Sequence, residues 1–76
     1  MTKISNWEEL SKLPPSKTHY LDVDSYYGKG WIRDLNNNSG IIYLSTHTFY
    51  NQRNVKNANN KLNKCGFDIE LISWED

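Results

Sequence analysis

The stretch "QRNVKNANNKLNK", residues 52–64, decides the fold, because it is the most biased segment of the chain and carries a helical period. Apolar residues recur in and just after it at intervals of three and four: Val55, Ala58, Leu62 and Cys65. Such a stripe is typical of a helix that packs one face against a core. Asn51 or Thr48 can cap its start, and Gly66 stands where a helix commonly ends. The stretch therefore predicts one main helix.

The opposite face of this helix is basic and rich in amides. It contains no acid, and we expect it to be the binding surface, made of Arg53, Lys56, Asn57, Asn60, Lys61 and Lys64. Lys and Arg neutralise phosphates and Asn can read adenine, whereas the same charges also suit an acidic protein surface. A third interpretation is a solvated helix face without a partner. Glu is a better helix former than Asn, so its absence favours a binding face.

Three strands are predicted upstream of the helix. "THYLDVD", residues 18–24, alternates apolar and polar side chains, as a half-buried strand does. "GWIRDL", residues 30–35, and "GIIYLSTH", residues 40–47, have the composition of two more strands. Between them, "NNNSG", residues 36–40, supplies the Asn and Gly residues that favour an antiparallel hairpin. We therefore expect a mostly antiparallel sheet.

A short helix is predicted before these strands, in "SNWEELSKLPP", residues 5–15. Ser5 is placed as its N-cap, and Glu8 completes a capping box three residues later. The apolar residues that fall on one face are Ile4, Trp7 and Leu10. The two prolines that follow stop the helix.

The chain closes with a strand in "FDIELISW", residues 67–74. Alternation directs Phe67, Ile69 and Leu71 inward and leaves Ile72 and Trp74 on the outer face. Two large apolar side chains there need a cover, either from Trp7 of the first helix or from another chain. Ile72 and Trp74 are therefore a candidate interface, and a homodimer is one way to form it.

These elements predict a small α+β fold, a single domain over residues 1–76 with the order α-β-β-β-α-β. We expect a three- to four-stranded, mostly antiparallel sheet with the main helix packed on one face. The order α-β-β-β-α resembles that of double-stranded RNA-binding domains with a strand appended, and Arg53 and Lys56 stand where that family places bases. The Gly-Pro-x-His loop and the Lys-Lys-x-Ala-Lys run of that family are absent.

Composition excludes several classes of protein. Nine Lys and Arg residues balance nine Asp and Glu residues, but residues 50–65 carry no acid and residues 66–76 carry no base. The lone Cys65 excludes an internal disulfide and a multi-cysteine zinc site. Without a membrane-length apolar run or a signal peptide, we expect a cytoplasmic protein with no membrane contact. The sequon Asn37-Asn38-Ser39 is then only a turn.

No arrangement of residues predicts catalysis, a metal or a cofactor. His19 and His47 are the only imidazoles, and neither stands at a spacing that pairs it with a nucleophile. Asp22 and Asp24 share a strand face, which a solvated surface explains as well as a metal does. "DLNNNSG" begins like a calcium loop, but Gly40 falls one place late and Ser45 replaces the bidentate Glu.

One segment supports nucleic-acid binding. Rings and bases alternate in Tyr26, Tyr27, Lys29, Trp31 and Arg33, a pattern that suits stacking on a single strand. Tyr27 and Lys29 are therefore added to the candidate residues. In a domain this small, aromatic strands also serve the core.

We therefore expect a small, non-enzymatic binding module that occupies a partner's surface. Its most favoured partner is a protein, and direct RNA or DNA binding is the alternative. A cofactor-free chain rich in Asn and Lys resembles products that compact AT-rich genomes, such as those of phages, encode to inhibit or modulate a host complex.

Overall fold

The elements of the chain follow the predicted order, with one strand added at the N-terminus. The computed structural model describes residues 1–37 and 40–74. Its elements are β1 (Thr2–Ile4), α1 (Trp7–Ser11), β2 (His19–Asp24), β3 (Lys29–Asp34), β4 (Ile42–Leu44), α2 (Gln52–Lys64) and β5 (Ile69–Leu71). The α+β class, the antiparallel three-stranded sheet and the one main helix are confirmed.

The antiparallel sheet has the strand order β2-β3-β4. Its register places Leu21 opposite Ile32 and Trp31 opposite Tyr43. Ile32 is fully buried, and Leu21 packs against the core from the same side. A side chain at Gly30 would crowd β2, because its Cβ would lie 3.1 Å from Val23 Cγ2. The alternation expected for β2 is therefore confirmed, since Leu21 and Val23 both pack against the core.

β4 is shorter than the predicted strand over residues 40–47. It ends at Leu44 because the next carbonyl, that of Ser45, accepts hydrogen bonds from the N–H of Thr48 at 3.1 Å and from its hydroxyl at 2.7 Å. This turn leads the chain away from the sheet and into α2. In the hairpin before β4, residues 38 and 39 lie outside the described part of the chain. They include most of the sequon and the third position of the calcium-like pattern.

The final strand pairs with a strand that was not predicted. β1 and β5 form a separate two-stranded parallel sheet, with Thr2 opposite Ile69 and Ile4 opposite Leu71. The N–H of Ile72 continues the pairing by donating to the carbonyl of Ile4 at 3.0 Å. Ile4 is buried as expected, but from a strand and not from the face of the first helix. β5 is shorter than the predicted strand over residues 67–74, because Ile72 and Trp74 lie beyond its end. Phe67, Ile69 and Leu71 are buried, as expected.

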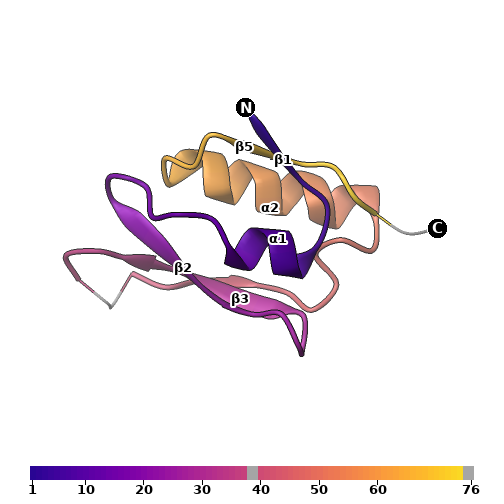
Figure 1. Ribbon diagram of the computed structural model, residues 1–76, viewed down its shortest axis with the longest axis horizontal. Helices are drawn as coiled ribbons and strands as arrows, with labels where there is room; N and C mark the ends of the chain where they lie inside the picture. The colour runs from indigo at the N-terminus through magenta and orange to yellow at the C-terminus, as the bar shows by residue number, and fades with distance from the viewer. Residues whose placement is uncertain (38–39, 75–76) are drawn as a thin grey trace.

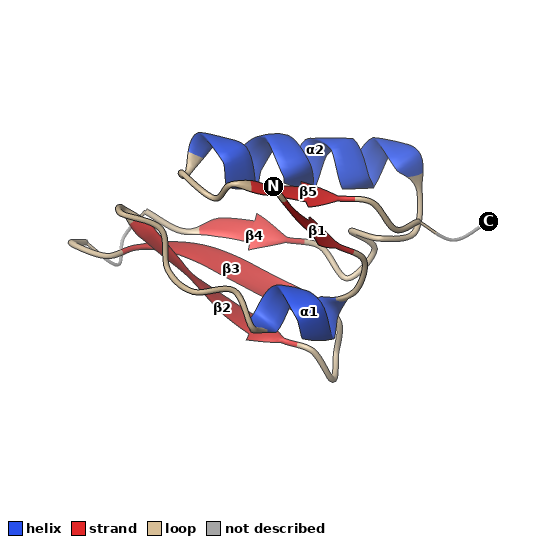
Figure 2. Cartoon of the chain, turned by 45° about the horizontal axis from the view of Figure 1, so that its top comes forward, coloured by secondary structure: helices blue, strands red, loops and turns tan. Residues whose placement is uncertain are grey.

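A single core joins the two sheets and the two helices. Figures 1 and 2 show the three-stranded sheet on one side of the molecule and α2 with β1 and β5 on the other. Leu10 of α1, Ile32 and Leu44 of the sheet, and Leu62 of α2 are its most completely buried large side chains. Phe49, for which the sequence pattern predicts no role, also belongs to the core. It meets the ring of Trp7 edge-on at 5.3 Å between centroids.

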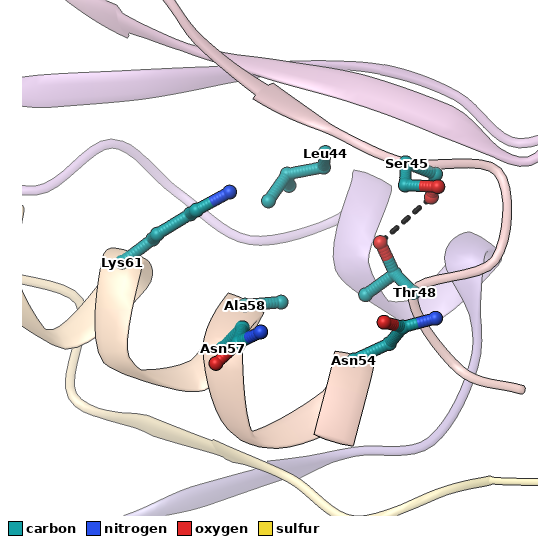
Figure 3. Close-up of a pocket in the computed structure, with 7 residues that line it drawn as sticks. All are labelled: Leu44, Ser45, Thr48, Asn54, Asn57, Ala58 and Lys61. Carbon is teal, nitrogen blue, oxygen red and sulfur yellow. Dashed lines mark hydrogen bonds between the residues drawn. The ribbon is translucent and has the colours of Figure 1, made fainter. Parts of the chain in front are cut away.

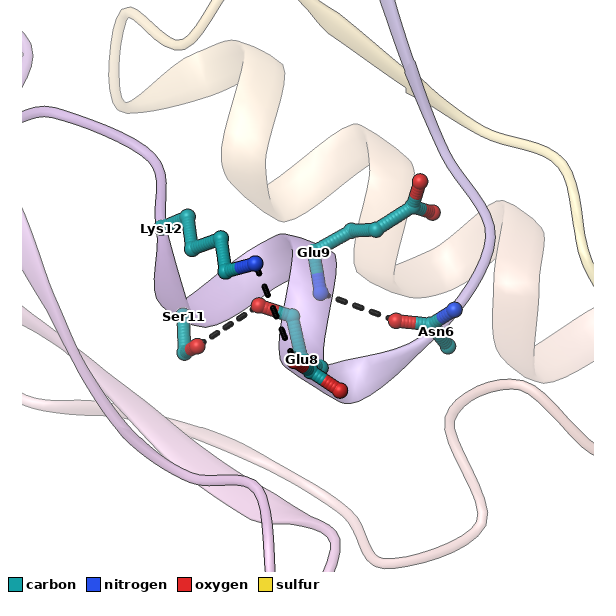
Figure 4. Close-up of polar contacts among 5 residues, drawn as sticks. All are labelled: Asn6, Glu8, Glu9, Ser11 and Lys12. Atoms are coloured by element: carbon teal, nitrogen blue, oxygen red, sulfur yellow. Dashed lines mark hydrogen bonds and ion pairs between the residues drawn. The ribbon is translucent and has the colours of Figure 1, made fainter.

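The predicted N-cap of α1 is wrong by one residue. Asn6 is the N-cap, and its side-chain oxygen accepts from the N–H of Glu9 at 2.8 Å (Figure 4). Glu9, not Glu8, returns the contact, because its carboxylate accepts from the N–H of Ser5 at 2.8 Å and from the Ser5 hydroxyl at 2.6 Å. Asn6 is therefore the cap, and Ser5 is the residue that donates to the Glu9 carboxylate.

Candidate functional site

The helix α2 carries most of the candidate residues, and both of its ends are capped as expected. The side chain of Asn51 accepts from the N–H of Asn54 at 2.8 Å. At the other end Gly66 has a φ of 90°, which a residue with a side chain rarely adopts. There the N–H of Gly66 donates to the carbonyl of Asn63, and the N–H of Phe67 donates to that of Leu62, both at 3.1 Å. These caps hold the helix in one register and so fix which side chains face solvent.

The predicted binding face of α2 lies on the molecular surface. All six of its residues are exposed: Arg53, Lys56, Asn57, Asn60, Lys61 and Lys64. Within residues 1–37 and 40–74, the ion pairs are Lys12 with Glu8 and Arg33 with Asp22, so none of the four cations of α2 has an acidic partner there. We call this set of six residues the cationic face.

The two ends of the cationic face differ in electrostatic terms. Lys61 and Lys64 lie in the last turn of α2, where the helix dipole favours positive charge. Arg53 lies in the first turn, where the dipole disfavours a cation and where α2 has no acid. Helix stability therefore explains the two lysines near the C-terminal end but not Arg53.

Three of the five asparagines of α2 have partners inside the protein. Asn54 donates to the carbonyl of His47 at 3.0 Å. Asn59 accepts from the N–H of Leu71 at 3.3 Å, and Asn63 donates to the carbonyl of Ile69, also at 3.3 Å. These last two amides satisfy the edge of β5 that faces away from β1. Most of the asparagine content is thus explained by the fold, and only Asn57 and Asn60 remain as amides of the cationic face.

A groove lies between the first half of α2 and the chain that follows β5. Its volume is about 350 Å³. The residues that line it are Gln52, Val55, Lys56, Asn59, Glu70, Leu71, Ile72 and Trp74. Ile72 is 45% exposed and Trp74 46%, so the candidate interface, which lies just after β5, remains open to solvent. Trp7 does not cover it, since Trp7 is buried with its ring against Phe49.

A smaller and more polar pocket lies on the other side of α2, against the end of β4. It measures about 100 Å³ and is lined by Leu44, Ser45, Thr48, Asn54, Asn57, Ala58 and Lys61. Figure 3 shows the amine of Lys61 directed across the opening toward Leu44. The ammonium of Lys61 and the amide of Asn57 are suited to a single carboxylate or a similarly small anionic group.

The aromatic and basic residues of β3 and its hairpin gather on the outer face of the sheet. The amine of Lys29 lies 5.6 Å from the ring centroid of Tyr27 and 5.7 Å from that of Trp31. Arg33 lies 5.8 Å from the Trp31 ring and also pairs with Asp22 at 3.0 Å. Trp31 is therefore already flanked by two cations, and the charge of one of them is neutralised.

The two histidines considered for catalysis contact different residues, and neither imidazole is hydrogen-bonded to Ser45. His19 Nδ1 shares a hydrogen bond of 2.7 Å with the hydroxyl of Thr18. The ring of His47 packs against that of Tyr50, with 5.5 Å between the ring centroids. The hydroxyl of Ser45 accepts from the backbone N–H of His47, not from its imidazole. Burial raises the pKa of the Cys65 thiol, which keeps it protonated and poorly nucleophilic.

The carboxylates considered for a metal have other partners. Asp24 accepts from the N–H groups of Tyr26 and Tyr27 in the β2–β3 turn, and Asp34 accepts from the N–H of Asn36. In the part of the chain that the structure describes, no three His, Cys, Asp or Glu side chains form a group that could hold a metal ion.

Comparison of the chain with protein-family models, with curated proteins and with solved structures finds no match. No helix in the described ranges has the length and apolar character needed to span a membrane.

Proposed function

We propose that this chain is a non-enzymatic binding module that acts by covering an acidic surface of a partner protein with the cationic face of α2. The observation that carries the proposal is a set of four cations on α2 that have no acidic partner within residues 1–37 and 40–74. They stand without an acid among them, and Arg53 occupies a helix position that helix electrostatics disfavours. An acidic partner would offset both the mutual repulsion of these charges and the unfavourable dipole term.

A protein is favoured over phosphate by what lies next to the cations. Lys56 belongs at once to the cationic face and to the groove that exposes Ile72 and Trp74. Protein interfaces combine a desolvated aromatic or aliphatic centre with a charged rim. A nucleic-acid backbone would engage the lysine but would leave Ile72 in water. On this proposal the chain inhibits or modulates a host complex by occupancy, as a phage-like product would.

Charge reversal on α2 tests the proposal. We expect Arg53→Glu, Lys56→Glu and Lys64→Glu together to weaken binding to a partner recovered from the native host by about a hundredfold or more, which corresponds to about 2.7 kcal/mol. The helical circular dichroism signal should persist, because all three side chains are exposed.

The matched control reverses three lysines that belong neither to the cationic face nor to the groove, Lys12, Lys17 and Lys29. It changes the net charge by the same amount, so binding should change by no more than a few fold. If the α2 variant is folded and binds as tightly as the wild type, the cationic face is only a solvated surface and the proposal fails.

Direct nucleic-acid binding is the second candidate, favoured by the shared location of Tyr27, Lys29 and Trp31 on one face. It predicts an association constant for single-stranded RNA or DNA that falls steeply and linearly with salt on a log–log scale. The protein candidate predicts no such uniform slope, so the salt dependence distinguishes the two.

A further inference from the structure

We infer that the groove beside α2 is the anchor point of the acidic partner, and that it receives a large apolar side chain, Leu or Phe, from a segment whose neighbouring residues are Asp or Glu. This role rests on the proposed function and adds side-chain specificity to it. The cationic face would supply charge attraction, while the groove would select which acidic segment is bound.

The walls of the groove provide the apolar surface that an anchor requires. Val55 and Leu71 are almost completely buried, and Ile72 and Trp74 stand beside them with nearly half of their surface in contact with water. Covering such exposed apolar area stabilises a complex by about 25 cal/mol per Å² before the costs of association. Aromatic residues in a partly formed pocket are also the commonest centres of binding energy in interfaces.

The backbone around the groove is held in place before any partner arrives. The N–H of Ile72 donates to Ile4 at 3.0 Å, and the N–H of Leu71 donates to the Asn59 side chain at 3.3 Å. α2 forms the opposite wall and is capped at both ends. A groove whose walls are fixed at α2 and at Leu71 and Ile72 loses little conformational entropy there on binding, which favours a specific anchor over non-specific apolar association.

The charges at the groove define the residues that flank the anchor. Lys56 is the cation in the lining and Glu70 is the acid. Glu70 stands opposite Lys3 in the β1–β5 register, although the two side chains form no ion pair. Lys56 has no acidic partner among the described residues. An Asp or Glu next to the anchor would therefore reach Lys56, and acids farther along would reach Arg53.

A second copy of the chain fits this groove less well. A two-fold pairing would bring the cations of one α2 toward those of the other, with one acid in each groove lining to offset them. Like charges that face each other across an interface disfavour association.

Two matched peptides test the anchor without requiring a variant. One is a short Asp- and Glu-rich peptide with two central Leu residues, and the other has Ala in place of both. We expect the Leu peptide to bind at least about tenfold more tightly, since each lost apolar group in a pocket costs about that factor. In NMR spectra the Leu peptide should shift the indole N–H signal of Trp74 and the methyl signals of Ile72. The Ala peptide should leave the chemical shifts of both residues unchanged.

The variant Trp74→Ala should remove the preference for Leu and leave the weaker binding of the Ala peptide unchanged. Tyr26→Ala is the matched control, because Tyr26 is an even more exposed aromatic residue in the β2–β3 turn. Reversal of Arg53, Lys56 and Lys64 should weaken both peptides alike. A chain that binds both peptides equally, through α2 alone, would keep the proposed function but overturn the anchor.

Three other outcomes would also overturn the anchor. One is the absence of any shift at Ile72 and Trp74 with the Leu peptide. Another is a dimer in sedimentation that Trp74→Ala dissociates, which would assign the groove to self-association. The third is a larger shift of Trp74 with oligo-deoxythymidine than with the Leu peptide, which would assign it to nucleic acid.

Discussion

The two sides of α2 use the same amide side chain in different ways. On the side toward β5, Asn59 and Asn63 bond to the backbone of Leu71 and Ile69. On the solvent side, Asn57 and Asn60 have no hydrogen-bond partner among the described residues. The first pair closes a strand edge that would otherwise be open, and the second pair is available to a partner. Composition alone therefore does not distinguish an amide that stabilises the fold from one that binds.

The strand edge explains why asparagine stands on the inner side. β5 pairs with β1 along one edge only, and the N–H and C=O groups on its other edge must find partners when they are shielded from water. Asn is short and carries both a donor and an acceptor, so a helix beside the strand can satisfy both kinds of group. The cost in helix propensity is offset by these hydrogen bonds.

The largest effect on stability is expected from removal of the inner amides. Asn59→Ala with Asn63→Ala should lower the free energy of unfolding by about 2 kcal/mol. The two hydrogen bonds to β5, of about 1 kcal/mol each, are lost together with the contacts of Asn63 to Asn59, and a partly buried N–H is left without a partner. A gain of roughly 1 kcal/mol in helix propensity opposes these losses. Urea denaturation measures this change. An unchanged midpoint would mean that these amides do not support β5.

The outer amides should behave in the opposite way. Asn57→Ala with Asn60→Ala should raise the free energy of unfolding by about 1 kcal/mol, because Ala is the better helix former and no internal contact is lost. The same variant should bind the partner more weakly if these amides touch it. Destabilisation similar to that of the inner pair would remove the distinction between the two sides of α2.

The sequence predicts local features of this fold well and long-range ones poorly. The stripe of Val55, Ala58 and Leu62 and the ending at Gly66 depend on neighbours within the helix, and both are confirmed. β1 was missed because three residues show no period, and the strand exists only through its pairing with β5. The bonds from Asn59 and Asn63 to β5 were missed for the same reason.

The candidate site could be predicted only in part. Exposure of the cationic face follows from helical geometry, so Arg53 and Lys64 lie where they were expected. The groove beside Lys56 could not be anticipated, because it forms between segments whose relative position depends on the tertiary fold. The sequence signal for it was limited to Ile72 and Trp74, which were expected on the outer face of the last strand and lie just after its end.

The smallest expected effect concerns the pH dependence of stability, and it involves the carboxylate of Glu9 in α1. Glu9 is exposed, as Asn60 is, but its carboxylate accepts hydrogen bonds from another residue of the chain. Its hydrogen bonds from the hydroxyl and then the N–H of Ser5 lower the pKa of the Glu9 carboxyl. Because the folded pKa lies below the unfolded one, the stabilisation is fully present above the unfolded pKa and is lost as the pH falls through the folded pKa.

Acid should therefore destabilise the wild type slightly more than it destabilises Ser5→Ala, and NMR titration should place the Glu9 pKa of that variant closer to its ordinary value. The backbone N–H of Ser5 remains in the variant, so the return should be incomplete. Glu9→Gln removes the titrating group and should flatten the same part of the pH–stability curve. If the pKa of Glu9 is the same in the wild type and in Ser5→Ala, the hydrogen bond from the Ser5 hydroxyl does not persist in solution. An exposed polar group of this protein would then not be held by a contact of this kind.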